Sequence, residues 1–198
     1  VRDGEKKRFI QLGTGMTDER YRGRGMIRRL MAEVEHDCAG KADGVYLFAN
    51  DTVLDFYPKF GFCRAAEVRY ARALEPCGAA SAVRVPMRDR DSWDRLTAVI
   101  RSSAPCGRFS LCGNTGLPLF YVSKFMQDCV YRVAPETYAV AELEDGVLHR
   151  VQLGFTPLDT TGWEAEAVHE DDTTLFVRGA GFRDFERRGL MFPVLAHA

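Results

Sequence analysis

Five arginines and two glycines lie close together in the stretch ERYRGRGMIRR, residues 19–29. Gly23 and Gly25 can adopt backbone angles closed to other residues, so they let main-chain N–H groups approach a ligand closely. The helical pattern that begins at Met26 adds free N–H groups and the positive end of a helix dipole, which together bind anions. Arginines at a helix start oppose that dipole by about 0.3–1 kcal/mol each, so the cluster is better explained if an anion offsets it. A solvated basic turn is an equally weighted alternative when the stretch is taken alone.

The spacing of the glycines excludes two nucleotide-binding loops. A mononucleotide P-loop requires GxxxxGK[ST], which the chain lacks. A dinucleotide loop requires GxGxxG, but the pattern that begins at Gly13 has Asp18 at its third glycine position, and the one that begins at Gly23 has Arg28 there. The anion is therefore held in some other way.

The elements that must position this stretch follow from hydrophobic periodicity and capping residues. The expected order is strand, loop, helix, strand and short helix, over residues 8–16, 17–25, 26–38, 44–50 and 51–57. Asp51 or Thr52 can cap the short helix, and Gly61 suits a left-handed position beyond its end. Pro58 must shorten or distort that helix unless it lies in the final turn.

Two of these segments resemble motifs of the GNAT superfamily of N-acetyltransferases. RYRGRG, which contains Arg20, Gly23 and Gly25, has the R/Q-x-x-G-x-G/A spacing by which this family holds the pyrophosphate of acetyl-CoA. NDTVLDFYPKFGF resembles the family's N-x-x-A-x-x-x-Y helix closed by GF, with Val53 in place of the alanine. Both motifs follow strands in the family's order, and the resemblance covers residues 8–72.

The resemblance implies a binding site for acetyl-CoA. The end of the first strand, residues 14–17, would pair its backbone with the pantetheine arm. Backbone N–H groups of residues 22–25 would hold the pyrophosphate, and Arg28 or Arg29 would be available for the ribose phosphate. The implied cofactor-binding residues are Thr14, Gly15, Met16, Thr17, Arg20, Arg22, Gly23, Arg24, Gly25, Met26, Arg28, Asn50 and Tyr57.

The same resemblance implies two catalytic groups. Tyr57 matches the tyrosine that gives a proton to the departing CoA thiolate, a role suited to a hydroxyl whose pKa is near ~10. The main-chain N–H of Met16 would stabilise the developing oxyanion. Asn50 matches the asparagine that hydrogen-bonds the cofactor arm. The alternative for Tyr57 is a core tyrosine on an amphipathic helix.

The general base is not apparent in the sequence. An amine acceptor with a pKa near ~10 must lose a proton before it attacks. The first strand offers only Gln11 and Thr14, and Glu67 follows the tyrosine motif without a pattern that places it in the cleft. A water chain, a residue upstream of Val1 and the C-terminal carboxylate at Ala198 are the other candidates.

The chain divides into two expected domains around residues 75–83, EPCGAASAV, a linker of small and turn-forming residues. Residues 1–74 predict an α/β (α+β) GNAT domain, with a mixed, mostly antiparallel sheet flanked by helices. Residues 84–198 predict two helices and then a hairpin-rich sheet, which resembles a second GNAT-like α+β domain without the motifs. A GNAT domain normally opens with further strands and helices, so the resemblance implies an N-terminal piece beyond these 198 residues.

Composition limits the partners. With 46% hydrophobic and 28% charged residues, the chain is typical of a globular protein. A formal charge of -1 argues against nucleic acid as a partner, and no apolar run approaches the ~20 residues that cross a membrane. The six cysteines form no CxxC pair, so they predict no metal site and favour reduced thiols in a cytoplasmic protein.

The sequence therefore favours an N-acetyltransferase that moves an acetyl group from acetyl-CoA to a primary amine. The amine belongs to a small molecule or a peptide, and the attack is direct, in a ternary complex. The alternative is a non-catalytic acyl-CoA-binding regulatory protein. The intact Tyr57 favours the enzyme, whereas the missing base favours the regulator. A homodimer is expected from family habit alone.

Overall fold

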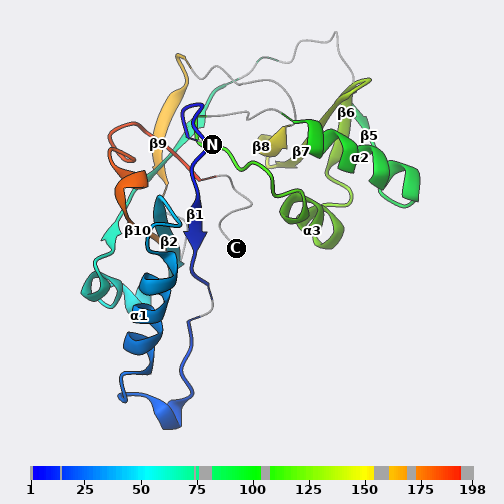
Figure 1. Ribbon diagram of the computed structural model, residues 1–198. Coiled ribbons are helices and arrows are strands. Elements are labelled where there is room, and N and C mark those ends of the chain that lie inside the picture. The colour runs from blue at the N-terminus through cyan, green and yellow to red at the C-terminus, as the bar shows by residue number, and fades with distance from the viewer. Residues whose placement is uncertain are drawn as a thin grey trace. The chain divides into compact units, whose positions relative to one another are not determined.

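The computed structural model describes residues 2–13, 15–73, 75, 82–103, 108–153, 161–168 and 173–192, with the backbone alone for residues 150–153. These residues pack as two compact units. The first unit comprises Lys6–Arg69 and Ala165–Met191, and the second comprises Val1–Glu5, Tyr70–Glu164 and Phe192–Ala198. Each unit has its own sheet and its own buried core (Figure 1).

A four-stranded sheet forms the centre of the first unit. Its strands run in the order β1 (Phe9–Gln11), β2 (Gly44–Ala49), β10 (Thr174–Arg178) and β3 (Cys63–Arg64). β1 and β2 are parallel, whereas β10 is antiparallel to both of its neighbours. The expected mixed, mostly antiparallel sheet is confirmed. β4 (Glu67–Ala71) and β9 (Glu164–Val168) pair with each other as a separate ladder.

The two faces of this sheet carry different side chains because residues along a strand alternate between faces. The core on one face consists of Val45, Leu47, Ala49, Phe62 and Phe176. On the other face, the Tyr46 ring lies 6.3 Å from the Phe182 ring between centroids. β2 has buried residues on both faces, which explains why GVYLFA is apolar throughout.

Helix α1 (Met26–Cys38) covers the face that carries Leu47 and Phe176. It has the bounds expected from its apolar spacing. Met31 and Cys38 pack against the core, but none of the helix residues is fully buried, and Met26 and Leu30 are exposed. The helix therefore attaches to the sheet along one narrow stripe.

The second unit is built from two helices and an antiparallel meander. The helices are α2 (Arg90–Ser102) and α3 (Gly116–Lys124), and the strands are β5 (Val83–Arg84), β6 (Val130–Ala134), β7 (Thr137–Glu144) and β8 (Val147–Leu153). The strands lie in the order β5-β6-β7-β8. Asp89 caps α2 by accepting from the N–H of Ser92 at 2.8 Å. The unit's core includes Leu96, Val122 and Val130.

The local predictions for this half are confirmed. Both helices and the hairpin-rich sheet are present, in the expected order. Asp145 and Gly146 have φ of 48° and 79° and join β7 to β8 in a two-residue turn, as their residue types require. That this unit is a degenerate GNAT fold stays a prediction.

The structure differs from the expected division into residues 1–74 and 84–198. Residues 165–191 pack with residues 6–69, so residues 70–164 of the second unit interrupt the first unit along the chain. The physical reason is that β10 fills the place between β2 and β3, a pairing of distant segments that no local pattern reveals. Within the proposed linker, residues 76–81 lie outside the described residues.

The end of the first strand and the short helix after β2 also differ from expectation. The first strand ends at Gln11 rather than Met16, and the short helix is replaced by 3-10 turns at Asp51–Val53 and Tyr57–Phe60. Pro58 has no N–H to continue an α-helix across this stretch. Gly61 has φ of 77° after the second turn, as predicted. In the part of the chain that the structure describes, no helix is long and apolar enough to cross a membrane.

Candidate functional site

β1 and β2 part at the edge of the sheet where both strands end. β1 pairs only with the first half of β2, through Gln11 and Tyr46, and the N–H of Leu12 donates to the Tyr46 carbonyl at 2.9 Å. Beyond that point Leu47–Ala49 pair with β10 alone. The main chain of Gly13, Gly15 and Met16 makes no hydrogen bond with other described residues. Two facing stretches of backbone are therefore open to an extended ligand.

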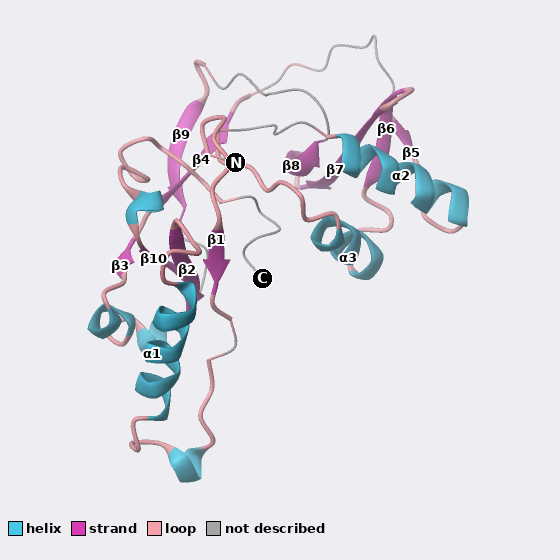
Figure 2. Ribbon diagram, in the orientation of Figure 1, coloured by secondary structure: helices cyan, strands magenta, loops and turns pink. Residues whose placement is uncertain are grey.

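A long loop leaves the end of β1 and returns into the start of α1. Its 3-10 turn, Glu19–Tyr21, lies at the end of the loop farthest from the sheet (Figure 2). Asp18 accepts from the N–H of Arg20 at 3.0 Å and from the Arg20 guanidinium at 3.1 and 3.2 Å. These bonds hold the pKa of the Asp18 carboxyl below its ordinary value. The loop is therefore shaped partly by its own ion pair.

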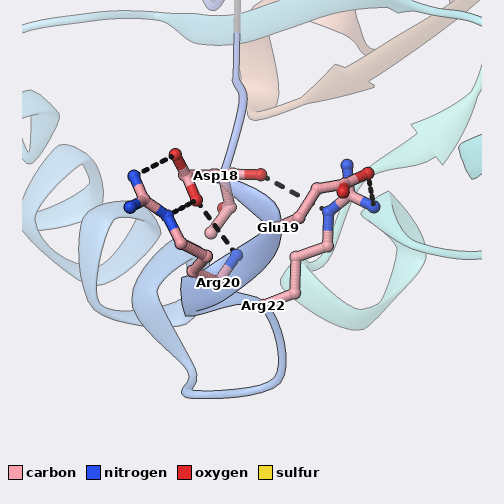
Figure 3. A network of polar contacts seen from close by, with 5 residues as sticks. Asp18, Glu19, Arg20 and Arg22 are labelled. Carbon is pink, nitrogen blue, oxygen red and sulfur yellow. Dashed lines mark hydrogen bonds and ion pairs between the residues drawn. The ribbon is translucent and has the colours of Figure 1, made fainter.

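Arg22 is also held within this loop. Its guanidinium lies 3.3 Å from Glu19 and donates to the Thr17 carbonyl at 3.4 Å (Figure 3). The main-chain N–H of Arg22 donates to the Glu19 carbonyl at 3.2 Å. The expectation that this N–H is open to a pyrophosphate is therefore wrong, because the 3-10 turn already uses it.

The next residues do present open N–H groups. Gly23 and Gly25 have φ of 74° and 73°, the left-handed region that favours glycine. Within the described chain, no protein group accepts from the N–H of Gly23, Arg24 or Gly25. Gly25 begins α1 without a side-chain cap, and the first turn of the helix contains no acidic residue. This is the geometry of an anion site at a helix N-terminus.

The remaining arginines of the cluster differ from Arg20 and Arg22. The Arg24 guanidinium lies 5.2 Å from the centre of the Tyr21 ring. Arg28 and Arg29 are exposed on the first turns of α1 and have no ion pair among the described residues. The positive charge available to an anion therefore comes from Arg24, Arg28 and Arg29.

Asn50 follows β2 on the same edge of the sheet, because parallel β1 and β2 end there together. Its side-chain oxygen accepts from the N–H of Thr52 at 3.1 Å and so caps the turn Asp51–Val53. The cap leaves the amide nitrogen of Asn50 without a partner among the described residues. Asn50 is thus positioned by its oxygen and can donate through its nitrogen.

Tyr57 packs on the sheet close to the point at which β1 and β2 part. Its ring centroid is 5.6 Å from that of Phe176, whose neighbour across β2 is Leu47. Burial raises the pKa of the Tyr57 hydroxyl above its ordinary value. That hydroxyl has no hydrogen bond to any described residue. The side chain is half-buried, so it combines a core ring with an available proton donor.

Arg178 of β10 fixes the turn that carries Tyr57. Its guanidinium donates to the Phe60 carbonyl at 2.9 Å, lies 4.9 Å from the centre of the Phe62 ring and is 3.8 Å from Glu35 of α1. Sequence reasoning missed this residue, because β10 is more than a hundred residues from the tyrosine motif. The sequence around Arg178 contains no pattern that indicates its contact with Phe60.

The predicted site residues are partly brought together. Thr14 lies outside the described residues, while Gly15, Met16 and Thr17 follow β1 along the open edge. The side chain of Met16 is exposed. Glu67, which no sequence pattern placed in the cleft, lies on β4 and is 5% exposed. No group of three or more metal-ligating side chains occurs among the described residues.

Part of the chain matches a known protein family. Residues 2–62 match the model of the Acetyltransferase (GNAT) family. The resemblance of the glycine loop and the tyrosine motif to GNAT proteins is thereby confirmed for this segment, which contains both motifs. GNAT proteins generally use acyl-CoA and act on amines.

A solved structure has a similar fold. It is a conserved protein of unknown function from Enterococcus faecalis V583, described as a "Probable N-Acyltransferase". The TM-score is 0.52 at 14% sequence identity, over 93% of this chain and 57% of the other. The chain thus spans little more than half the length of that neighbour. No curated protein sequence matches the chain.

Proposed function

We propose that the first unit is an N-acetyltransferase that uses acetyl-CoA and acts on a primary amine. The observation that carries the proposal is the set of open N–H groups at Gly23, Arg24 and Gly25, directly before α1, in the loop that leaves the parted strands. A Cβ built at Gly23 or Gly25 would meet nothing within 4 Å, so the ligand side of this backbone is open space. The residues present therefore fit a diphosphate.

The residues divide the work of holding the donor. The N–H groups of Gly23, Arg24 and Gly25 bind the diphosphate, while Arg28 or Arg29 neutralises the ribose phosphate. The backbone of residues 15–17 and the amide nitrogen of Asn50 bind the arm that leads to the thioester. Bound acetyl-CoA supplies an activated acetyl group.

Two groups of the chain then act on the reaction. The N–H of Met16 donates to the thioester oxygen as negative charge develops there. The Tyr57 hydroxyl gives its proton to the sulfur that leaves, and the proton that the amine loses as its N–C bond forms restores the phenol through water. Because burial raises the pKa of Tyr57, the phenol stays protonated at neutral pH and serves as an acid rather than a base.

The test compares native protein with the variant Tyr57→Phe. Acetyl-CoA should raise the melting temperature of both proteins, since the ring is retained and the diphosphate site is untouched. Release of CoA thiol in the presence of an amine panel should fall by about 10²–10⁴-fold in the variant, the usual contribution of a general acid. Tyr131→Phe, a change in the second unit, should leave thiol release unaltered.

Two results would count against the proposal. If acetyl-CoA does not shift the melting temperature, the diphosphate site is wrong. If acetyl-CoA binds but no amine gives thiol release in either protein, the first unit is a regulatory acyl-CoA-binding domain instead.

A further inference from the structure

The first unit contains a cavity on the face of the sheet opposite to Tyr57. Its volume is about 270 Å³. Its wall is formed by β2, by the chain from β3 into β4, by the start of β10 and the residue before it, and by Val168 and Glu186. None of the site residues that hold the donor contributes to this wall.

The register of the strands places one wall residue of the cavity, Phe48, on the part of β2 that lies beyond its pairing with β1. Phe48 and Leu175 both line the cavity, and they are directly paired across β2 and β10. Phe48 lies just beyond Tyr46, the last β2 residue that pairs with β1. Since neighbours along a strand point to opposite faces, Phe48 faces away from Leu47 and hence from the Tyr57 ring. The cavity therefore meets this part of β2 on the face opposite to Tyr57.

The cavity wall contains a deeply buried carboxyl group. Glu67 is 5% exposed and lines the cavity. Glu186 adds a second carboxylate, one of whose oxygens accepts from the N–H of Ala66 at 2.7 Å. Arg64 also lines the cavity, but its guanidinium lies 3.7 Å from Asp55 and is itself exposed. The acidic groups thus outnumber the basic one.

Glu67 influences Tyr46, a residue of β2. Burial raises the pKa of Tyr46 to about 12, and the negative charge of Glu67 contributes to this rise. The Tyr46 hydroxyl donates to the side-chain oxygen of Gln11 on β1 at 3.1 Å. The carboxyl group of Glu67 therefore lies near the side chain of Tyr46, which is on the same face of β2 as Phe48.

We propose that this cavity binds the amine acceptor and that Glu67 is the counter-charge that selects an ammonium group. The proposal rests on the function proposed above, whose donor site it complements. Phe48, Val168 and Leu175 supply apolar wall for the body of the acceptor. The volume suits a small amine or one end of a larger one. With the acceptor on one face and Tyr57 on the other, amine and thiol occupy different sides of the acyl group.

The proposal is tested with charged and neutral ligands of equal shape. The probes are 2-phenylethylamine and hexylamine, compared with 2-phenylethanol and hexanol, and binding is measured by calorimetry on the full chain saturated with CoA. The native protein should bind each amine more tightly than the matching alcohol. Glu67→Gln, which keeps the shape of the side chain, should weaken amine binding by roughly tenfold or more and leave alcohol binding unchanged.

Matched variants keep the test decisive. Glu166→Gln removes an exposed carboxylate that pairs with Arg69 outside the cavity, and it should preserve the preference for amines. Val168→Trp should fill the cavity and weaken amines and alcohols alike, which provides a second readout if Glu67→Gln fails to fold. The steady-state KM for the amine should rise in both cavity variants, while the KM for acetyl-CoA should not.

The two proposals fail in different ways. No preference of the native protein for amines, or an equal preference in Glu67→Gln, overturns the assignment of the cavity even when acetyl-CoA binds and is consumed. Loss of the CoA-induced rise in melting temperature, by contrast, overturns the donor site itself.

Discussion

At the scale of single residues, a substitution at Gly25 can distinguish the effect of backbone strain from the loss of ligand binding. It precedes α1 with φ of 73°, and a Cβ placed on it would have no neighbour within 4 Å. Replacement by alanine therefore meets no clash, and its cost is backbone strain of about 1–2 kcal/mol. Relief of that strain by a change in φ would turn the N–H groups of residues 23–25 away from their common direction.

We expect Gly25→Ala to weaken acetyl-CoA binding by roughly tenfold or more, the loss of one or two charge-assisted hydrogen bonds. Gly113→Ala is the matched control, because Gly113 also has φ of 73° and no neighbour within 4 Å, and it belongs to the second unit. Both variants should lose similar stability in chemical denaturation. Equal CoA affinity in the two variants, measured by calorimetry, would contradict the role given to Gly25.

The sequence predicted this residue but not the state of its neighbours. The glycine spacing requires left-handed backbone at Gly23 and Gly25, and the structure has it. The pairing of Arg20 with Asp18 and of Arg22 with Glu19 could not be predicted. Alternating charges in TDERYR allow several ion pairs of equal spacing, and the 3-10 turn decides between them.

At the scale of elements, β10 holds the site together from a distant part of the chain. Its Arg178 ties the carbonyl of Phe60 to β10 and also lies near Glu35 of α1. Removal of the guanidinium leaves that carbonyl without its donor in a half-buried place, which costs about 1–3 kcal/mol. The turn that carries Tyr57 would then be less well fixed.

Arg178→Met should therefore lower the free energy of unfolding by about 1–3 kcal/mol and reduce kcat while the KM for acetyl-CoA changes little. Arg69→Met is the control on neighbouring β4, where an exposed ion pair of 3.3 Å with Glu166 is lost. The control should change stability by about 0–1 kcal/mol. Chemical denaturation and steady-state kinetics measure both. Equal effects of the two variants would mean that Arg178 does no more than pair charges at the surface.

The elements themselves were predictable wherever their signal is local. The expected 26–38 helix is present because apolar spacing acts over a few residues, and Asp145 and Gly146 form the turn of a hairpin by equally local turn chemistry. The turns around Tyr57 differ from the expected helix because Pro58 lacks the N–H that helix needs. β10 could be identified as a strand, but its place between β2 and β3 depends on pairing with strands from which it is separated in sequence by residues 70–164.

At the scale of the whole molecule, the chain forms two separate hydrophobic cores, and each unit consists of segments that are not continuous in sequence. Leu47 belongs to the core of the first unit and Leu96 to that of the second, and each is 2% exposed. The two clusters share no residue. A core that contains its own buried apolar residues can lose stability on its own, so we expect the units to unfold in two transitions.

Leu47→Ala and Leu96→Ala form a matched pair for this expectation. Each removes the same side chain from an equally buried position and should cost about 2–5 kcal/mol. Differential scanning calorimetry should show a different transition lowered in each variant. Acetyl-CoA should raise only the transition that Leu47→Ala lowers, because the open N–H groups and Tyr57 belong to the first unit. A single transition that both variants lower equally would show that residues 70–164 and the segments on either side of them fold as one cooperative body, and that the donor site depends on the inserted unit for its stability.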